Sequence, residues 1–171
     1  MVVAHAQLLR ELVEAMILGS SLRVQMLHLP DGRRFWVKRA EDLSLRFRLL
    51  KGDARQSFEA ERTALNFLAE RGLPVVEIAL DGSDYMVTPH VGRTLRDLLL
   101  APATGLEDVA AAFSEAGYAL ASLHNAGFAH GRPALRDICW DGEEVRFIDL
   151  EHVAAIAIQD SFKVTTVIPC R

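Results

Sequence analysis

The sequence predicts an α+β fold in which a small antiparallel sheet and a group of helices occupy different parts of the chain. Residues 21–40 alternate apolar and polar side chains on either side of the turn Pro30-Asp31-Gly32, which is typical of a β-hairpin. Residues 109–123 instead repeat apolar side chains every three or four positions, which is typical of an amphipathic helix. Separate blocks of strands and helices indicate the α+β class.

Length and composition are those of an ordinary globular protein. The chain has 171 residues, 50% hydrophobic and 25% charged, which suits one domain or two small lobes. A net charge of -4 gives no electrostatic argument for a nucleic-acid partner. Cys139 and Cys170 are too few for a disulfide framework, and no run has the form of a signal peptide or a membrane span. We therefore expect a cytoplasmic protein without a transmembrane segment.

The first half of the chain alternates helices and strands. Apolar residues at helical spacing between Leu8 and Met16 predict an opening helix that ends at Gly19, before the hairpin. A basic stretch follows the hairpin: Arg46, Arg48, Lys51 and Arg55. Next comes a predicted helix that buries three apolar side chains and is stopped by Gly72 and Pro74. Those three side chains are Phe58, Leu65 and Leu68. Residues 75–80 and 85–91 predict two further strands around a turn at 81–84.

The second half is predominantly helical. Capping boxes at Thr94–Asp97 and Thr104–Glu107 predict a short helix and then a long one. The predicted buried stripe of the long helix is Val109, Phe113, Ala116, Leu120 and Leu123. A loop leads to two short apolar runs on either side of Asp141-Gly142, which predict a second small hairpin.

Four charged residues stand where packing alone would not place them. Lys38 lies within the second strand of the first hairpin, and Glu61 lies on the helix that follows, with Glu59 as a rival two positions earlier. Asp137 lies in the loop after the long helix, and Asp149 follows an apolar strand. A lysine can neutralise phosphate, a carboxylate can fix its direction, and further carboxylates can hold Mg²⁺.

The order of these residues resembles that of the protein-kinase-like superfamily, and most closely the small bacterial lipopolysaccharide-kinase and RIO-like group. The matching runs are WVKRA, FEAERTAL, YMVTPHVGRTLRDLL and LASLHNAGFAHGRPALRDICWDGEEVRFIDLE, in the family's order, within residues 19–151. The resemblance implies a compact bilobal fold, with a sheet lobe over residues 1–91 and a helical lobe over 92–171. Because residues 159–171 lack a helical period, the helical lobe is expected to be minimal or truncated.

The resemblance also implies ATP and Mg²⁺ as cofactors and assigns residue roles. Lys38 would bind phosphate, Glu61 would pair with it, and Pro89 and Val91 would border the nucleotide from the hinge-like run. The implied Mg²⁺ ligands are Asp149 and Asp137, which replaces the usual asparagine.

The catalytic loop departs from the family pattern. Aligning His130 with the loop histidine puts Arg132 where the catalytic aspartate belongs, and a guanidinium cannot accept a proton. Asp137 is then the alternative proton acceptor, whereas His130 is expected to hydrogen-bond the loop backbone. Arg132 and Arg136 either contact substrate or close the loop through salt bridges. The glycine-rich phosphate loop is reduced to Gly19-Ser20-Ser21, and Asp149-Leu150-Glu151 replaces D-F-G, so that Glu151 either adds a carboxylate to the metal or faces solvent.

Three functions fit these observations. The leading one is an ATP- and Mg²⁺-dependent phosphotransferase acting on a hydroxyl of a sugar, a lipid-linked sugar or a protein. The second is a pseudokinase that binds nucleotide or a protein partner without catalysis, which Arg132 favours. The third is an interaction domain that binds no nucleotide.

Overall fold

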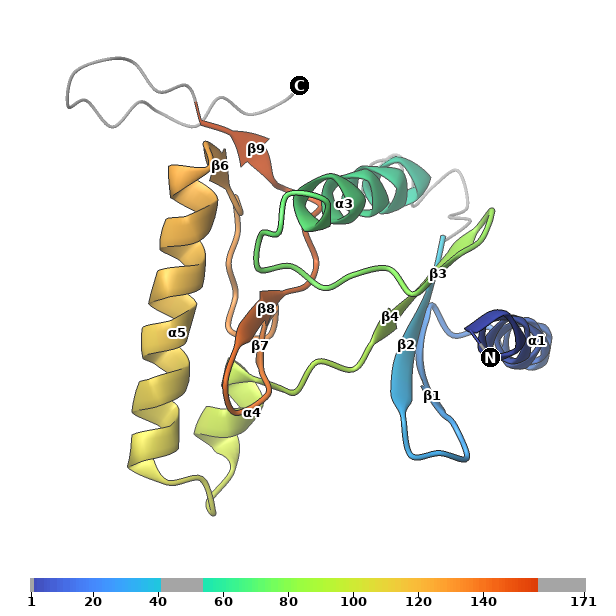
Figure 1. Cartoon of the computed structure of the whole chain (residues 1–171), viewed down its shortest axis with the longest axis horizontal. Helices are drawn as coiled ribbons and strands as arrows, with labels where there is room; N and C mark the ends of the chain where they lie inside the picture. The colour runs from blue at the N-terminus through green and yellow to red at the C-terminus, as the bar shows by residue number, and fades with distance from the viewer. Residues whose placement is uncertain (1, 41–53, 157–171) are drawn as a thin grey trace. The chain divides into compact units, whose positions relative to one another are not determined.

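The structure, a computed structural model, describes residues 2–40 and 54–156 (Figure 1). The chain divides into two compact units: Met1–Arg62 with Glu77–His90, and Thr63–Val76 with Val91–Arg171. The division into lobes at residue 91 stays a prediction. Part of the predicted basic stretch (Arg46, Arg48 and Lys51) lies outside the described residues, and so do residues 157–171.

The first unit is built on a four-stranded antiparallel sheet in the order β1-β2-β4-β3. Its strands are β1 (Val24–His28), β2 (Arg34–Arg39), β3 (Leu80–Asp81) and β4 (Tyr85–Pro89). The predicted hairpin is confirmed, since β1 and β2 pair antiparallel around a turn in which the Leu29 amide donates to the Arg33 carbonyl at 2.9 Å. Gly32 takes the left-handed φ of 86° that such a turn needs.

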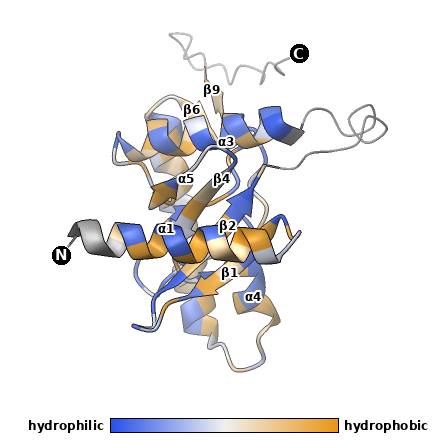
Figure 2. Cartoon of the chain, turned by 90° about the vertical axis from the view of Figure 1, so that its right-hand side faces the viewer, coloured by the Kyte–Doolittle hydropathy of each residue, from blue (hydrophilic) through white to orange (hydrophobic). Residues whose placement is uncertain are grey.

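Helix α1 (Val2–Gly19) packs on one face of this sheet (Figure 2). The buried residues of this contact are Leu9, Val13, Leu27, Leu29, Phe35, Val37, Leu80, Tyr85 and Val87. Arg39 on β2 fixes the end of α1, because its Nη1 donates to the Ser20 carbonyl at 2.8 Å. Since side chains alternate along a strand, β2 sends Phe35 and Val37 into this core and Lys38 to the opposite face.

Helix α3 (Ala54–Ala69) confirms the second predicted helix. Its three predicted core residues, Phe58, Leu65 and Leu68, are all buried. It ends through Gly72, whose amide donates to the Ala69 carbonyl at 2.9 Å and whose φ of 66° does not suit helix.

The predicted strand 75–80 is only partly correct. Leu80 and Asp81 pair with β4 as strand β3, and the Ala79 amide just before them donates to the Val87 carbonyl at 2.8 Å. Val75 and Val76 run beside Phe147 instead, and the Val76 amide donates to the Phe147 carbonyl at 3.0 Å within the second unit. The apolar run was recognised correctly, but its first residues pair with a strand that lies about seventy positions later in the chain.

Among its described residues, the second unit contains a three-stranded sheet, a two-stranded sheet and helices α4 and α5, besides the end of α3. Its elements are β5 (Arg93–Thr94), α4 (Leu95–Leu100), α5 (Leu106–Asn125), β6 (Phe128–Ala129), β7 (Ile138–Trp140), β8 (Val145–Phe147) and β9 (Ala154–Ala155). The sheets have the orders β5-β7-β8 and β6-β9, and the predicted hairpin at Asp141-Gly142 is confirmed as β7-β8.

The two predicted capping boxes have different outcomes. Thr94 caps α4, accepting a hydrogen bond from the Asp97 amide at 3.1 Å. The box at Thr104 is wrong, because Gly105 is the N-cap of α5 and no side chain caps that helix. Glycine tolerates this position at a small cost, so a nearby Ser/Thr…Glu pattern does not fix the first residue.

The buried face of α5 is rotated relative to the predicted stripe. Its buried residues are Ala112, Ala116, Ala119 and Leu123, whereas Phe113 is 38% exposed. Alanine lets the helix approach its neighbours closely, and the larger Phe113 is turned partly to solvent. The predicted stripe is thus correct at Ala116 and Leu123, and wrong at Phe113.

The backbone at His152 passes close to Gly131, whereas the corresponding side of Gly127 is open in the described part of the chain. The φ angles are nearly the same, 83° at Gly131 and 85° at Gly127. A Cβ at residue 131 would lie 2.1 Å from the His152 carbonyl oxygen, whereas a Cβ at residue 127 would meet nothing within 4 Å.

We predict that Gly131→Ala destabilises the protein by about 2 kcal/mol more than Gly127→Ala does. Both variants bear the cost of a left-handed alanine, but only Gly131→Ala adds an overlap that the backbone must relieve. Urea unfolding followed by circular dichroism measures both. Equal free energies of unfolding would show that the approach to His152 does not constrain the loop.

Candidate functional site

Lys38 and Glu61 form an ion pair between β2 and α3. The Lys38 Nζ donates to the Glu61 Oε2, and the two side chains are only 18% and 4% exposed. Water screens such a part-buried pair less than an exposed one. Lys38, which is predicted to bind phosphate, is thus paired with Glu61, the carboxylate that is predicted to direct it.

Glu59, the rival of Glu61, has a different partner. Its carboxylate accepts from Arg62, one helical turn along α3, and it is more exposed than Glu61. Burial explains the difference, because Glu61 lies on the same side of the helix as Phe58, Leu65 and Leu68.

The two hinge-like residues lie on either side of the unit boundary. Pro89 is the last residue of β4 and lies opposite Phe35 of β2. Val91 begins the second part of the second unit. Between them the His90 amide donates to the Arg34 carbonyl at 2.9 Å, so β4 stays attached to β2 up to the boundary.

His130 is fixed by packing rather than by the predicted hydrogen bond. The ring is buried and meets the Phe147 ring edge-on, with centroids 5.1 Å apart. Within the described residues neither ring nitrogen has a hydrogen-bond partner, which corrects the expectation. Burial lowers the pKa of His130, so the neutral ring is favoured.

The arginines of the loop are at the surface. Arg132 is exposed, in keeping with either of its predicted uses. Arg136 is also exposed, and its Nε lies 3.5 Å from the Asp137 Oδ1. This contact joins neighbours in sequence, so it does not close the loop, and an exposed partner contributes little to stability.

Asp137 and Asp149 are brought near one another by the β7-β8 hairpin. Asp137 immediately precedes β7, and the Ile148 amide, next to Asp149, donates to the Asp137 carbonyl at 2.9 Å. Burial raises the pKa of Asp137, and the negative charge of Asp149 raises it further. A cation between two such carboxylates would offset both effects.

Asp149 has an unusual backbone. Its φ of 62° makes it the single non-glycine residue with a positive φ among those described. Aspartate tolerates the left-handed region better than most residues, but the conformation still costs free energy. Strain of this kind, retained at a charged residue after a buried strand, is typical of a functional position.

Glu151 does not extend this pair into a larger cluster. Its carboxylate lies 3.4 Å from the His152 Nε2. No group of three or more His, Cys, Asp or Glu side chains that could hold a metal ion occurs in the described part of the chain. A cation at Asp137 and Asp149 would therefore need further oxygen ligands from water or from a phosphate.

Arg62 and Asp81 also belong to the surroundings of the ion pair, although nothing in the sequence singled them out. The Arg62 Nη1 lies 3.2 Å from the Asp81 Oδ1. The one available signal was the position of Arg62 directly after Glu61, because its partner comes nineteen residues later.

Comparison with known proteins gives a relationship at the level of fold. No family model matches the chain. An uncharacterized protein of Haemophilus influenzae is 34% identical over 121 residues, which are 71% of this chain and 50% of that protein. The chain thus spans half the length of this curated relative.

Three solved structures of WbdD share the architecture. A co-crystal structure with the kinase inhibitor LY294002 has a TM-score of 0.58 at 15% identity, over 81% of this chain and 32% of that one. A second WbdD structure gives 0.54 at 17%, over 77% and 33%. A structure of the bifunctional kinase-methyltransferase WbdD gives 0.52 at 16%, over 72% and 28%. The fold is kinase-like.

This finding confirms the predicted fold class. The kinase-like chain spans about a third of each WbdD chain, and at these identities the likeness concerns the fold alone. The closer assignment to the lipopolysaccharide-kinase and RIO-like group stays a prediction. No helix among the described residues is long and apolar enough to cross a membrane.

We predict that Asp137→Asn raises stability at neutral pH when divalent metal is removed with a chelator. The folded pKa of Asp137 lies above the ordinary value of 3.8, so stability falls as pH rises through the interval between them. The variant lacks this loss, and its advantage should shrink as pH is lowered towards 4. Urea unfolding at several pH values measures it. An Asp137→Asn variant that is less stable by the same amount at every pH would contradict the prediction.

Proposed function

We propose that the chain is an ATP- and Mg²⁺-dependent phosphotransferase that acts on a hydroxyl of a sugar, a lipid-linked sugar or a protein. The observation that carries the proposal is the buried ion pair of Lys38 with Glu61. A strand lysine paired with a helix carboxylate is the arrangement that directs an ammonium group towards nucleotide phosphates in kinases. The kinase-like fold supports the same reading.

The donor set suits the implied cofactors. Carboxylate oxygens are the ligands that Mg²⁺ prefers, and it keeps several waters when one or two carboxylates and a phosphate bind it. Asp149 and Asp137 would hold the ion, which would supply positive charge next to the transferring phosphoryl group. Lys38 would bind phosphate, Glu61 would keep it aimed, and Pro89 and Val91 would border the base.

The proton acceptor is the least conventional part of the proposal. With Arg132 at the usual position, Asp137 is the alternative acceptor for the proton of the substrate hydroxyl, and in that role it would leave the ion to Asp149. Its raised pKa makes it a better acceptor than an ordinary aspartate. His130 would keep the loop in shape through its contact with Phe147, and Arg132 would contact the substrate or its phosphate.

A second function is favoured by Arg132 itself. If no side chain accepts the proton, the same site would bind nucleotide without efficient transfer, as a pseudokinase does. The two proposals share nucleotide binding and differ in turnover.

We predict that Lys38→Ala weakens binding of Mg²⁺-ATP by about 10- to 100-fold, since a charge-assisted hydrogen bond to phosphate is lost. Asp149→Asn should remove the Mg²⁺ dependence of binding. Calorimetry with ATP, with and without Mg²⁺, measures both. Arg34→Ala is the control, because it removes a cation from the same strand at an exposed position.

Unchanged ATP affinity in Lys38→Ala would refute the site. No binding by the folded wild type would refute both nucleotide proposals and leave an interaction domain. Binding without transfer of the labelled γ-phosphoryl group from ATP to any candidate hydroxyl acceptor, and without its hydrolysis, would favour the pseudokinase.

A further inference from the structure

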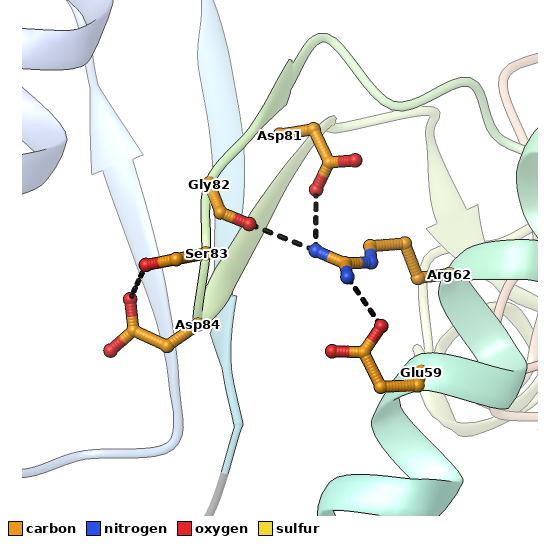
Figure 3. Close-up of polar contacts among 6 residues, drawn as sticks. All are labelled: Glu59, Arg62, Asp81, Gly82, Ser83 and Asp84. Atoms are coloured by element: carbon orange, nitrogen blue, oxygen red, sulfur yellow. Dashed lines mark hydrogen bonds and ion pairs between the residues drawn. The ribbon is translucent and has the colours of Figure 1, made fainter.

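Arg62 links α3 to the β3-β4 turn next to the Lys38–Glu61 pair. Figure 3 shows its guanidinium between three acceptors. Nη1 lies 3.2 Å from the Asp81 Oδ1 and 2.9 Å from the Gly82 carbonyl oxygen, and Nη2 donates to the Glu59 carboxylate. The Arg62 guanidinium carbon also lies 5.7 Å from the centre of the Phe58 ring. Such contacts leave the 22% exposed side chain little freedom.

The sheet residues that bind α3 lie in one row across the strands. Lys38 of β2 pairs with Met86 of β4, and Met86 pairs with Asp81 of β3. Residues directly opposite one another point to the same face, so Lys38 and Asp81 both point away from the α1 core. Two strand spacings separate them, about 10 Å.

Consecutive residues of α3 bind the two ends of this row. Glu61 reaches Lys38 and Arg62 reaches Asp81. Successive side chains point about 100° apart around a helix, so the two contacts restrain α3 in different directions. One ion pair alone would let the helix turn about its axis, whereas two at different angles oppose that rotation.

The turn itself is shaped to offer this contact. A Cβ at Gly82 would lie 2.4 Å from the Tyr85 ring, so only glycine lets the turn lie on that buried ring. The Gly82 amide donates to the Tyr85 carbonyl at 2.9 Å and so closes the turn, and the Gly82 carbonyl is left for another donor. Arg62 takes up that carbonyl.

We infer that Arg62 is a positioning residue, which with Asp81 and Gly82 fixes the rotation of α3 so that the Glu61 carboxylate stays on the Lys38 ammonium. This inference rests on the proposed function for its effect on nucleotide. The effect of Arg62 on the orientation of Glu61 does not depend on the proposed function. Exposed ion pairs such as Arg62–Asp81 contribute little to stability, so the effect on the lysine exceeds the effect on folding.

The test is a double-mutant cycle between Arg62→Ala and Glu61→Gln, read out as Mg²⁺-ATP affinity. Arg62→Ala should weaken binding about tenfold in the wild-type background and have no further effect in Glu61→Gln, where no carboxylate is left to orient. Equal losses in both backgrounds would show a merely structural role and overturn the inference. Arg71→Ala is the matched control, since Arg71 likewise donates to a backbone carbonyl, that of Phe67, and lies over a phenylalanine ring.

A second readout separates this inference from the proposed function. Acetylation of the Lys38 amine, followed by peptide mass spectrometry, should be several-fold faster in Arg62→Ala than in wild type or Arg71→Ala. If wild type binds no ATP but acetylation responds in this way, the proposed function fails and the positioning role stands. If ATP binding depends on Lys38 and Glu61 but neither readout responds to Arg62→Ala, the inference fails alone. Should Arg62→Ala not fold, Asp81→Ala gives the same test from the exposed end of the contact.

Discussion

The arrangement of the first unit depends on the burial of two opposite charges that have to meet. A buried ammonium or carboxylate group costs free energy unless a partner of opposite charge satisfies it. Because Phe35 and Val37 point into the core beneath α1, the alternation along β2 places Lys38 on the opposite face of the sheet. Glu61 is almost fully buried, so α3 has to present it to that lysine. Replacing such a pair by apolar side chains is often neutral or stabilising, so stability alone gives no reason to retain it. A function that needs the Lys38 ammonium group held in one direction would give a reason to retain the pair.

The second unit contains a complementary conflict between charge and burial. The β7-β8 hairpin holds Asp137 and Asp149 near one another, and burial together with mutual repulsion raises the pKa of Asp137. Asp149 adds a left-handed backbone that only a few residue types tolerate. Each feature works against stability, and local conflicts of this kind concentrate at functional sites. A divalent cation and a phosphate would resolve the electrostatic part of the conflict, because positive charge favours the ionised form of both carboxylates.

Local chemistry predicted what depends on neighbouring residues. The first hairpin follows from its turn residues and alternation, and the helix that carries Glu61 follows from its apolar spacing. What sequence could not supply is the identity of distant partners. The strand predicted at 75–80 was partly wrong because Val75 and Val76 pair with Phe147, and the Arg62–Asp81 contact depends on the register of β3 against β4. Likewise, the exposure of Phe113 depends on how closely alanines let α5 approach its neighbours.

Arg132 decides less about catalysis than its position suggests. Loss of a general base costs roughly 10²–10⁴-fold, whereas phosphoryl transfer depends mainly on positioning and on electrostatic stabilisation. Under the proposed function, the lysine of the first unit and the two carboxylates of the second unit would supply these larger contributions. The constraint falls instead on Asp137, because a carboxylate bound to a cation is a weaker base than a free one. If Asp137 binds the metal, no carboxylate in the loop accepts the proton; if it accepts the proton, Asp149 has to hold the metal with water and phosphate. The phosphotransferase and the pseudokinase therefore correspond to two uses of one side chain.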